Sequence, residues 1–266
     1  MNNYIERNHM NPSLRSIWIV VLAVLVLACA EDDPLPLATV DFKTDPAVVE
    51  VGLPVMFDNL SLNADRYEWR FGTQTSTDIS PTITFSSPGS IDVVLKAFTK
   101  DNQVDSVVKT ISVKQRYLTG YSITIYPTKD ENGDDWDAGA ADPADFFPDI
   151  IVQFIPDRDF EEDEILIDGP FENVDIPAFS VSLPDQAQIV LTNDEWAFTI
   201  FDFDEDDPAT PEDETDFVPM AGFSGFNPVL ANTIKNSAGD QGLITIFFPE
   251  DDVNPPFGVD FFFEIR

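Results

Sequence analysis

The apolar residues of this chain fall in short runs that alternate with turns rich in proline and acidic residues. In the clearest run, Tyr67, Trp69 and Phe71 alternate with the polar residues Glu68 and Arg70. A period of two is typical of a half-buried strand, because successive side chains of a strand point to opposite faces of the sheet. No segment shows the repeat of an amphipathic helix over about ten residues or more, and 21 prolines interrupt the chain. The sequence therefore predicts an all-β protein.

Residues 1–28 have the pattern of a targeting segment. Arg7 and Arg15 precede an unbroken apolar run over 17–27. This run is too short to span a bilayer but has the length of the apolar region of a signal peptide. It ends in Val26-Leu27-Ala28-Cys29, which resembles the lipobox of bacterial lipoproteins. The resemblance implies that residues 1–28 are removed and that Cys29 is lipidated and anchors the protein to a membrane. An ordinary secretory signal with a chance cysteine is the alternative.

Residues 29–37 read as a short acidic tether. Cys29 is followed by Ala30-Glu31-Asp32-Asp33, which resembles the surface-export signal of lipoproteins in one group of Gram-negative bacteria. That resemblance implies a location on the outer face of the outer membrane. A plain solvated linker explains the same charge run, so the choice between the periplasmic and the outer face stays open.

Cysteine and histidine usage narrows the possible chemistry. Cys29 is the only cysteine and His9 the only histidine, so the expected mature chain has no intramolecular disulfide and no histidine. Nucleophilic catalysis with a histidine base and zinc bound by histidine are thereby excluded. A carboxylate-pair hydrolase passes this test.

The net charge of −35 also restricts the partners. From Gln115 onward the chain carries 35 acidic and five basic residues. Such a surface repels nucleic acid, which needs lysine and arginine to neutralise its phosphates, so we expect no nucleic-acid partner. It favours divalent cations. With 43% hydrophobic residues and 23 phenylalanines, the chain has ample material for packed cores.

Residues 38–114 predict a first β-sandwich, because short apolar runs recur there at regular spacing with turn residues between them. The expected strands are 40–42, 55–57, 67–71, 83–85, 91–98 and 107–113.

The motifs of this segment resemble a PKD domain, which is an immunoglobulin-like module. The stretches that carry the resemblance are Phe57-Asp58-Asn59-Leu60-Ser61, Tyr67-Glu68-Trp69-Arg70-Phe71-Gly72, Pro81-Thr82-Ile83-Thr84-Phe85, Pro88-Gly89 and Val93-Val94-Leu95-Lys96-Ala97. The resemblance implies that Tyr67 and Trp69 fill the space between two sheets. After Gly72 the family often continues with Asp-Gly, whereas this chain has Thr73-Gln74-Thr75. The implied role is a spacer or adhesion module and not a catalyst.

Residues 115–266 predict a second, acidic β-sandwich of about eight strands. The expected strands are 121–126, 150–155, 179–183, 188–191, 196–203, 243–248 and 259–265. The expected fold class is therefore all-β, with two sandwich domains after a lipoprotein signal peptide.

Carboxylates gather at the ends of several of these strands. The stretch Ile200-Phe201-Asp202-Phe203-Asp204, followed later by Thr215-Asp216-Phe217, resembles a calcium-binding C2 domain. The resemblance extends to Pro148-Asp149-Ile150 and to an acidic loop at 130–137. It implies Ca²⁺ ligands at Asp149, Asp202, Asp204 and Asp216, with one more from the first loop, either Asp130 or Asp137.

Elementary chemistry points in the same direction. Asp202 and Asp204 are two residues apart, so in an extended strand their carboxylates project to one side. Like charges placed this way repel unless a cation joins them, and clustered hard oxygen ligands suit Ca²⁺. A merely solvated acidic surface is the alternative, because Glu205, Asp206 and other acids nearby exceed what one site needs.

Three function classes remain open. The first is a non-enzymatic, lipid-anchored surface module that binds Ca²⁺ and mediates adhesion or protein interaction. The second is a carbohydrate-binding accessory lipoprotein of a surface glycan-uptake system, in which Trp136 or Trp196 stacks on sugar rings, although buried core positions explain both residues equally. The third is the carboxylate-pair hydrolase. We expect the first class, with no catalytic residues.

Overall fold

The computed structural model describes residues 36–129, 133, 136, 148–156, 166–172, 174, 179–184, 188–203, 217–250 and 255–266. All regular elements in these ranges are strands, which confirms the all-β prediction. No helix in the described ranges has the length and apolar character to cross a bilayer. Cys29 and the expected signal peptide lie outside the described residues. Residues Ala38–Arg266 form one compact unit that contains two β-sandwich domains.

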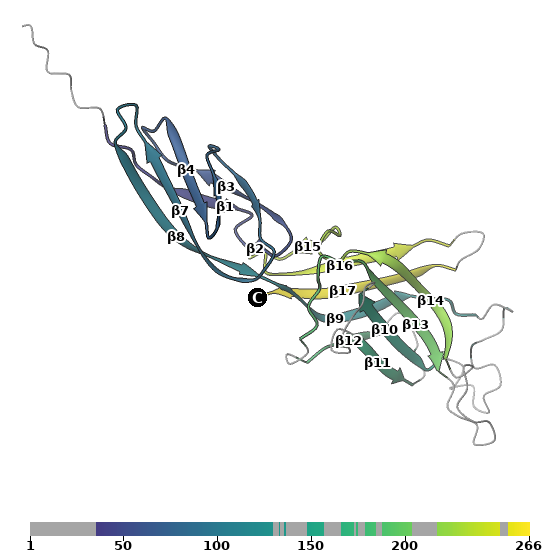
Figure 1. Ribbon diagram of the computed structural model, residues 1–266. Coiled ribbons are helices and arrows are strands. Elements are labelled where there is room, and N and C mark those ends of the chain that lie inside the picture. Colours follow the sequence, from purple (N-terminus) through teal and green to yellow (C-terminus); the bar gives the residue numbers. More distant parts are fainter. Residues whose placement is uncertain are drawn as a thin grey trace, which may run out of the picture. The chain divides into compact units, whose positions relative to one another are not determined.

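The first domain consists of a three-stranded and a five-stranded sheet (Figure 1). The smaller sheet has the order β1-β3-β6, and the larger has the order β2-β8-β7-β4-β5. The bounds are β1 Phe42–Asp45, β2 Val49–Glu50, β3 Pro54–Asn59, β4 Arg66–Phe71, β5 Gln74–Ser76, β6 Thr82–Thr84, β7 Gly89–Phe98 and β8 Val104–Lys114. The pairings are antiparallel except that of β2 with β8.

Trp69 is the centre of the first core. It is 2% exposed, and its ring meets Phe42 edge-on at 5.3 Å between centroids and stacks on Phe71 at 5.7 Å. Its indole N–H donates to the Asp78 carbonyl at 2.9 Å, so burial leaves no polar atom of this side chain unsatisfied. The half-buried Tyr67 packs at the edge of the same cluster. Both residues therefore lie in the core, as the sequence motifs imply.

The second domain consists of a four-stranded sheet, β11-β10-β13-β14, and a five-stranded sheet, β12-β9-β17-β16-β15 (Figure 1). Their bounds are β9 Arg116–Ile125, β10 Ile150–Pro156, β11 Leu166–Phe171, β12 Ser180–Ser182, β13 Trp196–Phe203, β14 Phe217–Phe226, β15 Ile234–Lys235, β16 Gln241–Phe248 and β17 Phe257–Ile265. The described residues thus contain nine strands where about eight were expected.

Aromatic rings from both sheets fill the second core. Phe198 is fully buried and meets Tyr121 at 6.3 Å and Phe261 at 5.2 Å between ring centroids. Phe154 stacks on Phe261 at 4.9 Å. Because β10 and β13 belong to one sheet and β9 and β17 to the other, these contacts join the two layers.

A buried ion pair connects β2 of the first domain to the start of β9 in the second domain. β8 ends at Lys114 and β9 begins at Arg116. The Arg116 guanidinium donates to both carboxylate oxygens of Glu50, from Nε at 2.6 Å and from Nη2 at 3.0 Å. Both side chains are at most 2% exposed. Lys235 adds a third charge at 3.1 Å from Glu50 Oε2.

Arg116 has two further contacts. Its Nη1 donates to the Pro228 carbonyl, and its guanidinium lies 4.2 Å from the centroid of the Phe263 ring. A planar group with a fixed fork of donors suits such a buried site better than a lysine does. The paired charges and the satisfied donors explain how an arginine can be buried here.

Tyr121 allows a prediction about alkaline pH. Its buried hydroxyl donates to Asp168 Oδ2 at 2.9 Å. Burial first, and then the negative charge of Asp168, raise the pKa of Tyr121 far above its ordinary value. The folded chain therefore keeps a proton that the unfolded chain loses above about pH 10, so stability falls as the pH rises beyond that point.

We expect Tyr121→Phe to cost about 1 kcal/mol near neutral pH, and to flatten the alkaline loss of stability. Urea unfolding as a function of pH measures both effects. Tyr117→Phe is the control, because the half-buried Tyr117 hydroxyl makes only a 3.4 Å contact with Gln115. Equal alkaline slopes in the wild type and in Tyr121→Phe would contradict the assignment.

Candidate functional site

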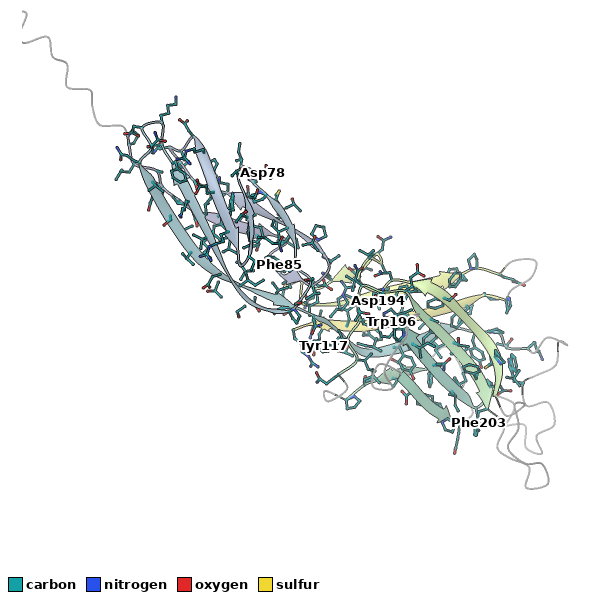
Figure 2. The ribbon with its side chains drawn as sticks, viewed as in Figure 1. Asp78, Phe85, Tyr117, Asp194, Trp196 and Phe203 are labelled. Carbon is teal, nitrogen blue, oxygen red and sulfur yellow. The ribbon has the colours of Figure 1, made fainter. Side chains whose placement is uncertain are left out.

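Two of the predicted Ca²⁺ ligands lie at neighbouring strand ends in the four-stranded sheet. Asp202 is the register partner of Ile150, the residue after Asp149. The backbone N–H of Phe203 donates to the Asp149 carbonyl at 2.8 Å. Figure 2 shows Trp196 and Phe203 at opposite ends of β13. The sheet therefore places the backbone of Asp149 next to the strand end that carries Asp202, although the two are far apart in sequence. Asp202 faces the core with its register partner Ile150, so alternation puts Asp149 on the other side of the sheet, with Phe203.

Asp202 is the more constrained of the two. It is 3% exposed and lies on the same side of β13 as Trp196, Phe198 and Ile200, all of which face the core. Removing an ionised carboxylate from water costs several kcal/mol unless a cation or hydrogen-bond donors compensate. A carboxylate buried at the rim of an apolar core therefore needs a hydrogen-bond donor or a cation beside it.

Two more predicted ligands are covalently attached to this strand end. Asp204 directly follows Phe203, and Asp216 directly precedes Phe217. Phe203 and Phe217 are register partners in β13 and β14. Asp204 and Asp216 themselves lie outside the described residues, so the convergence of their side chains stays a prediction.

The first acidic loop leaves the other sheet close to the same place. The Tyr126 hydroxyl donates to the Val174 carbonyl at 2.9 Å, and the Val174 N–H donates to the Pro148 carbonyl at 3.0 Å. The Tyr126 side chain is therefore linked through Val174 to Pro148, the neighbour of Asp149. Asp130 and Asp137, the alternative ligands from this loop, lie outside the described residues.

The two segments that adjoin these strand ends are strongly acidic. Segments 127–149 and 202–216 contain 17 of the 49 acidic residues of the chain, and Lys129 is their only basic residue. Among the described residues, no group of three or more Asp, Glu, His or Cys side chains is placed to hold a metal ion. This is expected, because only Asp149 and Asp202 of the six predicted ligands are described. Their oxygen chemistry fits Ca²⁺, which binds carboxylates and carbonyls.

The tryptophans predicted as possible sugar platforms belong to the core. Trp196 is 1% exposed and lies 4.6 Å from Phe154 between ring centroids, so it cannot stack on a ligand. Trp136 is partly buried against the same cluster, and its indole N–H donates to the Pro127 carbonyl at 2.8 Å. The stacking interpretation is therefore wrong for Trp196, and Trp136 is a core anchor.

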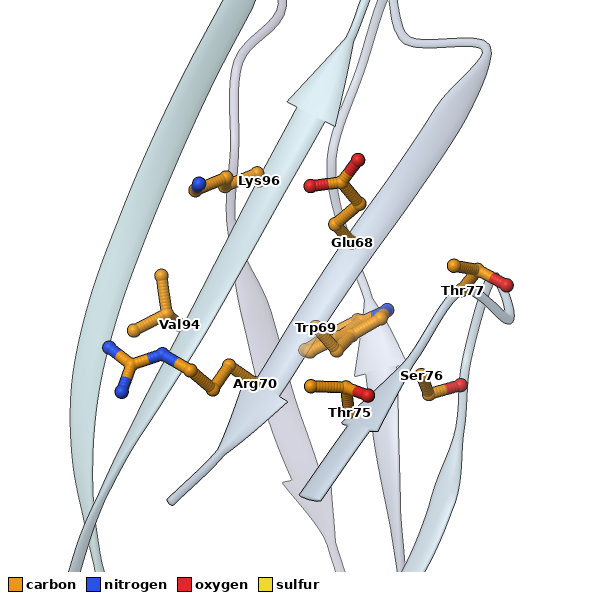
Figure 3. Close-up of a pocket in the computed structure, with 8 residues that line it drawn as sticks. All are labelled: Glu68, Trp69, Arg70, Thr75, Ser76, Thr77, Val94 and Lys96. Atoms are coloured by element: carbon orange, nitrogen blue, oxygen red, sulfur yellow. The ribbon is translucent and has the colours of Figure 1, made fainter. Parts of the chain in front are cut away.

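A second candidate site, which the sequence did not reveal, lies on the first domain. A groove of about 540 Å³ runs over the outer face of β4, β5 and β7 (Figure 3). Its polar lining comes from Glu68 and Arg70 of β4, Lys96 of β7 and the hydroxyls of residues 75–77. The alternation of β4 turns Arg66, Glu68 and Arg70 outward, and this alternation is the only local signal of the groove.

Comparisons with known proteins find likenesses to solved structures alone. No family model matches the chain, and no curated protein matches it. It is similar to the PKD1 domain of Vibrio anguillarum Epp, with 22% identity and a TM-score of 0.27 over 29% of this chain and 94% of that one. It is also similar to the PKD1 domain of the Vibrio cholerae metalloprotease PrtV, with 33% identity and a TM-score of 0.24 over 29% of this chain and 93% of that one.

A longer match is to a structure solved for carbohydrate-binding modules of the β-sandwich superfamily. The identity is 12% and the TM-score 0.30, over 88% of this chain and 92% of that one. The all-β fold described above is drawn from the strands and sheets of this chain and not from these likenesses. The C2 resemblance of the second domain stays a prediction from its acidic strand ends.

Proposed function

We propose that this chain is a non-enzymatic, lipid-anchored module of the outer membrane or cell surface that binds Ca²⁺ through the acidic loops of its second domain. The observation that supports the proposal is the buried Asp202 at the end of β13, next to the strand that begins directly after Asp149. The role that follows is adhesion or interaction with another protein. The first domain acts as a spacer that carries the calcium-binding domain.

The coordination chemistry assigns a part to each predicted ligand. Ca²⁺ takes six to eight oxygens at about 2.3–2.6 Å, a number that one carboxylate pair cannot supply. Asp149 and Asp202 would contribute from β10 and β13, Asp204 and Asp216 from the β13–β14 loop, and Asp130 or Asp137 from the first loop. Loops on a rigid sandwich suit this task, because the strands fix where each loop begins.

The anchor and the calcium site have complementary physical roles. A lipidated Cys29 would hold the chain at the membrane, which a chain of net charge −35 would otherwise avoid when the lipid is anionic. Bound Ca²⁺ would neutralise part of the acidic loops. Neutralisation would allow an anionic surface, on a partner protein or a neighbouring cell, to approach them.

Thermal unfolding in the presence and absence of Ca²⁺ tests the proposal. Extracellular sites bind Ca²⁺ with a Kd of about 10⁻⁴–10⁻³ M, so at the tight end of this range millimolar Ca²⁺ should stabilise the fold by about 1–2 kcal/mol. For a chain of this size the melting temperature rises by about 2–8 °C. Asp202→Asn should abolish the rise.

The matched control is Asp65→Asn, because Asp65 is an exposed acid in the first domain. It should keep the full response to Ca²⁺. An equal rise in Asp202→Asn and in Asp65→Asn would mean that Ca²⁺ only screens a solvated acidic surface.

The alternative function is a carbohydrate-binding accessory lipoprotein, and it loses the contact residues that the sequence suggested for it. Its predicted contact residues were Trp136 and Trp196, and both pack against the core of the second domain. A glycan partner would need a different surface.

A further inference from the structure

The groove on the first domain has the form of a small binding site. Arg70 of β4 pairs in register with Thr75 of β5 on one side and with Val94 of β7 on the other. Trp69 and Leu95 point into the core, so their neighbours Arg70 and Val94 point outward and line the groove (Figure 3). Three strands therefore hold the lining side chains in fixed positions.

Two cations in the groove lack an anionic partner within the described part of the chain. Lys96 is the register partner of Glu68, but the Glu68 carboxylate binds Arg66 at 3.2 Å instead. The remaining ion pairs of the described ranges involve neither Arg70 nor Lys96. In a chain with 49 acidic and 14 basic residues, free cations at neighbouring positions on one sheet mark a site for an external anion.

The local charge differs in sign from that of the whole chain. Arg66, Arg70 and Lys96 outnumber Glu68 and Asp92 on the outward side of β4 and β7, and residues 38–114 as a whole are close to neutral, with ten acidic and seven basic residues. At physiological ionic strength, exposed charges interact over only about 8 Å. An anion at the groove therefore experiences mainly these cations.

The uncharged part of the lining favours a saccharide over other anions. Thr75 and Thr77 line the groove, and their hydroxyls take part in no side-chain hydrogen bond among the described residues. Val94 and the methylene stem of Lys96 offer a small apolar surface. A ligand that satisfies all of these groups carries a carboxylate, several hydroxyls and a face of C–H groups.

We propose that the groove binds an acidic saccharide of the uronate class. The Arg70 guanidinium, which matches a carboxylate with two parallel hydrogen bonds, holds the sugar carboxylate together with Lys96. The hydroxyls of Thr75 and Thr77 bind the hydroxyls of the ring. The site lies in the first domain and does not depend on Ca²⁺ or on the acidic loops.

Calorimetric titration of the full mature chain with tri-galacturonate tests the proposal. The titration is done in the presence of a calcium chelator, so that the calcium site of the second domain has no part in the result. We expect saturable binding that weakens with added salt. Arg70→Gln and Lys96→Gln should each weaken it by about tenfold, because each removes one charge-assisted contact.

Lys100→Gln is the control, because Lys100 is exposed in the same domain but does not line the groove. It should bind as the wild type does. Arg70→Lys keeps the charge and loses the fork, so it should fall between the wild type and Arg70→Gln. It also replaces Arg70→Gln if that variant fails to fold, which a thermal melt shows.

Three results would overturn the proposal. The first is no binding by the wild type, and the second is equal binding of a neutral dextran oligomer. The third is equal binding of an oligo-glutamate of the same charge, which would show that the groove recognises carboxylates without recognising a sugar.

Discussion

Replacing Glu50 by glutamine is expected to lower the free energy of unfolding by about 3–5 kcal/mol. The substitution keeps the size of the side chain and removes its charge. Arg116, which is 2% exposed, then stays buried without the carboxylate that binds both its Nε and its Nη2. Removing one partner of a buried ion pair is costly because the remaining charge cannot be hydrated.

The effect should extend beyond the loop that carries Glu50. Glu50 belongs to β2 of the first domain, whereas Arg116 opens β9 and Lys235 ends β15 of the second. One carboxylate thus binds residues from two strands of the neighbouring sandwich. Urea unfolding followed by tryptophan fluorescence, which reports on Trp69 and Trp196 in the two cores, measures the loss.

The matched control is Glu68→Gln. Glu68 also pairs with an arginine, Arg66, at 3.2 Å, but about half of each side chain is exposed, 49% for Glu68 and 50% for Arg66. Exposed pairs contribute about 0–1 kcal/mol, so this variant should be nearly as stable as the wild type. Equal losses in the two variants would show that the Glu50–Arg116 pair is not buried as described.

Trp69→Ala should have an effect of similar size on the first domain. The change removes a ring that contacts Phe42, Phe57 and Phe71 and leaves the Asp78 carbonyl without its donor. Aromatic-to-alanine changes in packed cores cost about 3–5 kcal/mol, because the surrounding side chains fill the cavity only in part. Chemical denaturation measures the loss.

Ile79→Ala is the control for this experiment. Ile79 follows Asp78 but is 68% exposed, so the change should alter stability by no more than about 0.5 kcal/mol. A loss below about 1.5 kcal/mol in Trp69→Ala would contradict the assignment of Trp69 to the centre of the core, since mutations at well-packed core positions rarely cost so little.

The regularly alternating β13 was predictable from the sequence, whereas β14, which contains one proline and two glycines, was not. The expected strand at 196–203 is β13, which has a strictly alternating burial pattern. β14 was missed because Pro219, Gly222 and Gly225 within it read as turn signals. Gly222 is needed there for another reason, since a Cβ at that position would lie 2.7 Å from the Phe198 carbonyl oxygen of β13.

Other differences concern short segments whose pairing is not evident from the sequence. The expected strand at 188–191 contributes only an isolated bridge between Val190 and Tyr117. β5 and β15 are short and mostly polar edge strands. Such strands do not show the alternation of apolar and polar residues from which a strand is predicted. Their positions depend on pairing with β4 and β16, which is tertiary information.

The candidate sites also differ in how far they could be predicted from the sequence. Asp149 and Asp202 could be singled out because acids directly flank apolar strands, a pattern that survives in the linear sequence. The Glu50–Arg116 pair joins residues 66 positions apart, and no local sequence pattern predicts it. Glu68, Arg70 and Lys96 read as an ordinary solvated face, since the sequence does not show that the Glu68 carboxylate binds Arg66.

A crystal structure of the mature chain grown with Ca²⁺, with anomalous data collected to locate the ion, tests the central claim most directly. The account predicts one or more Ca²⁺ ions at the Phe203 end of β13, with carboxylate oxygens of Asp202 and of at least two other predicted aspartates at about 2.3–2.6 Å. The opposite result is an ordered strand end in which Asp149, Asp202 and Asp216 point away from one another and no anomalous peak appears. That result would leave a two-sandwich scaffold without a metal site.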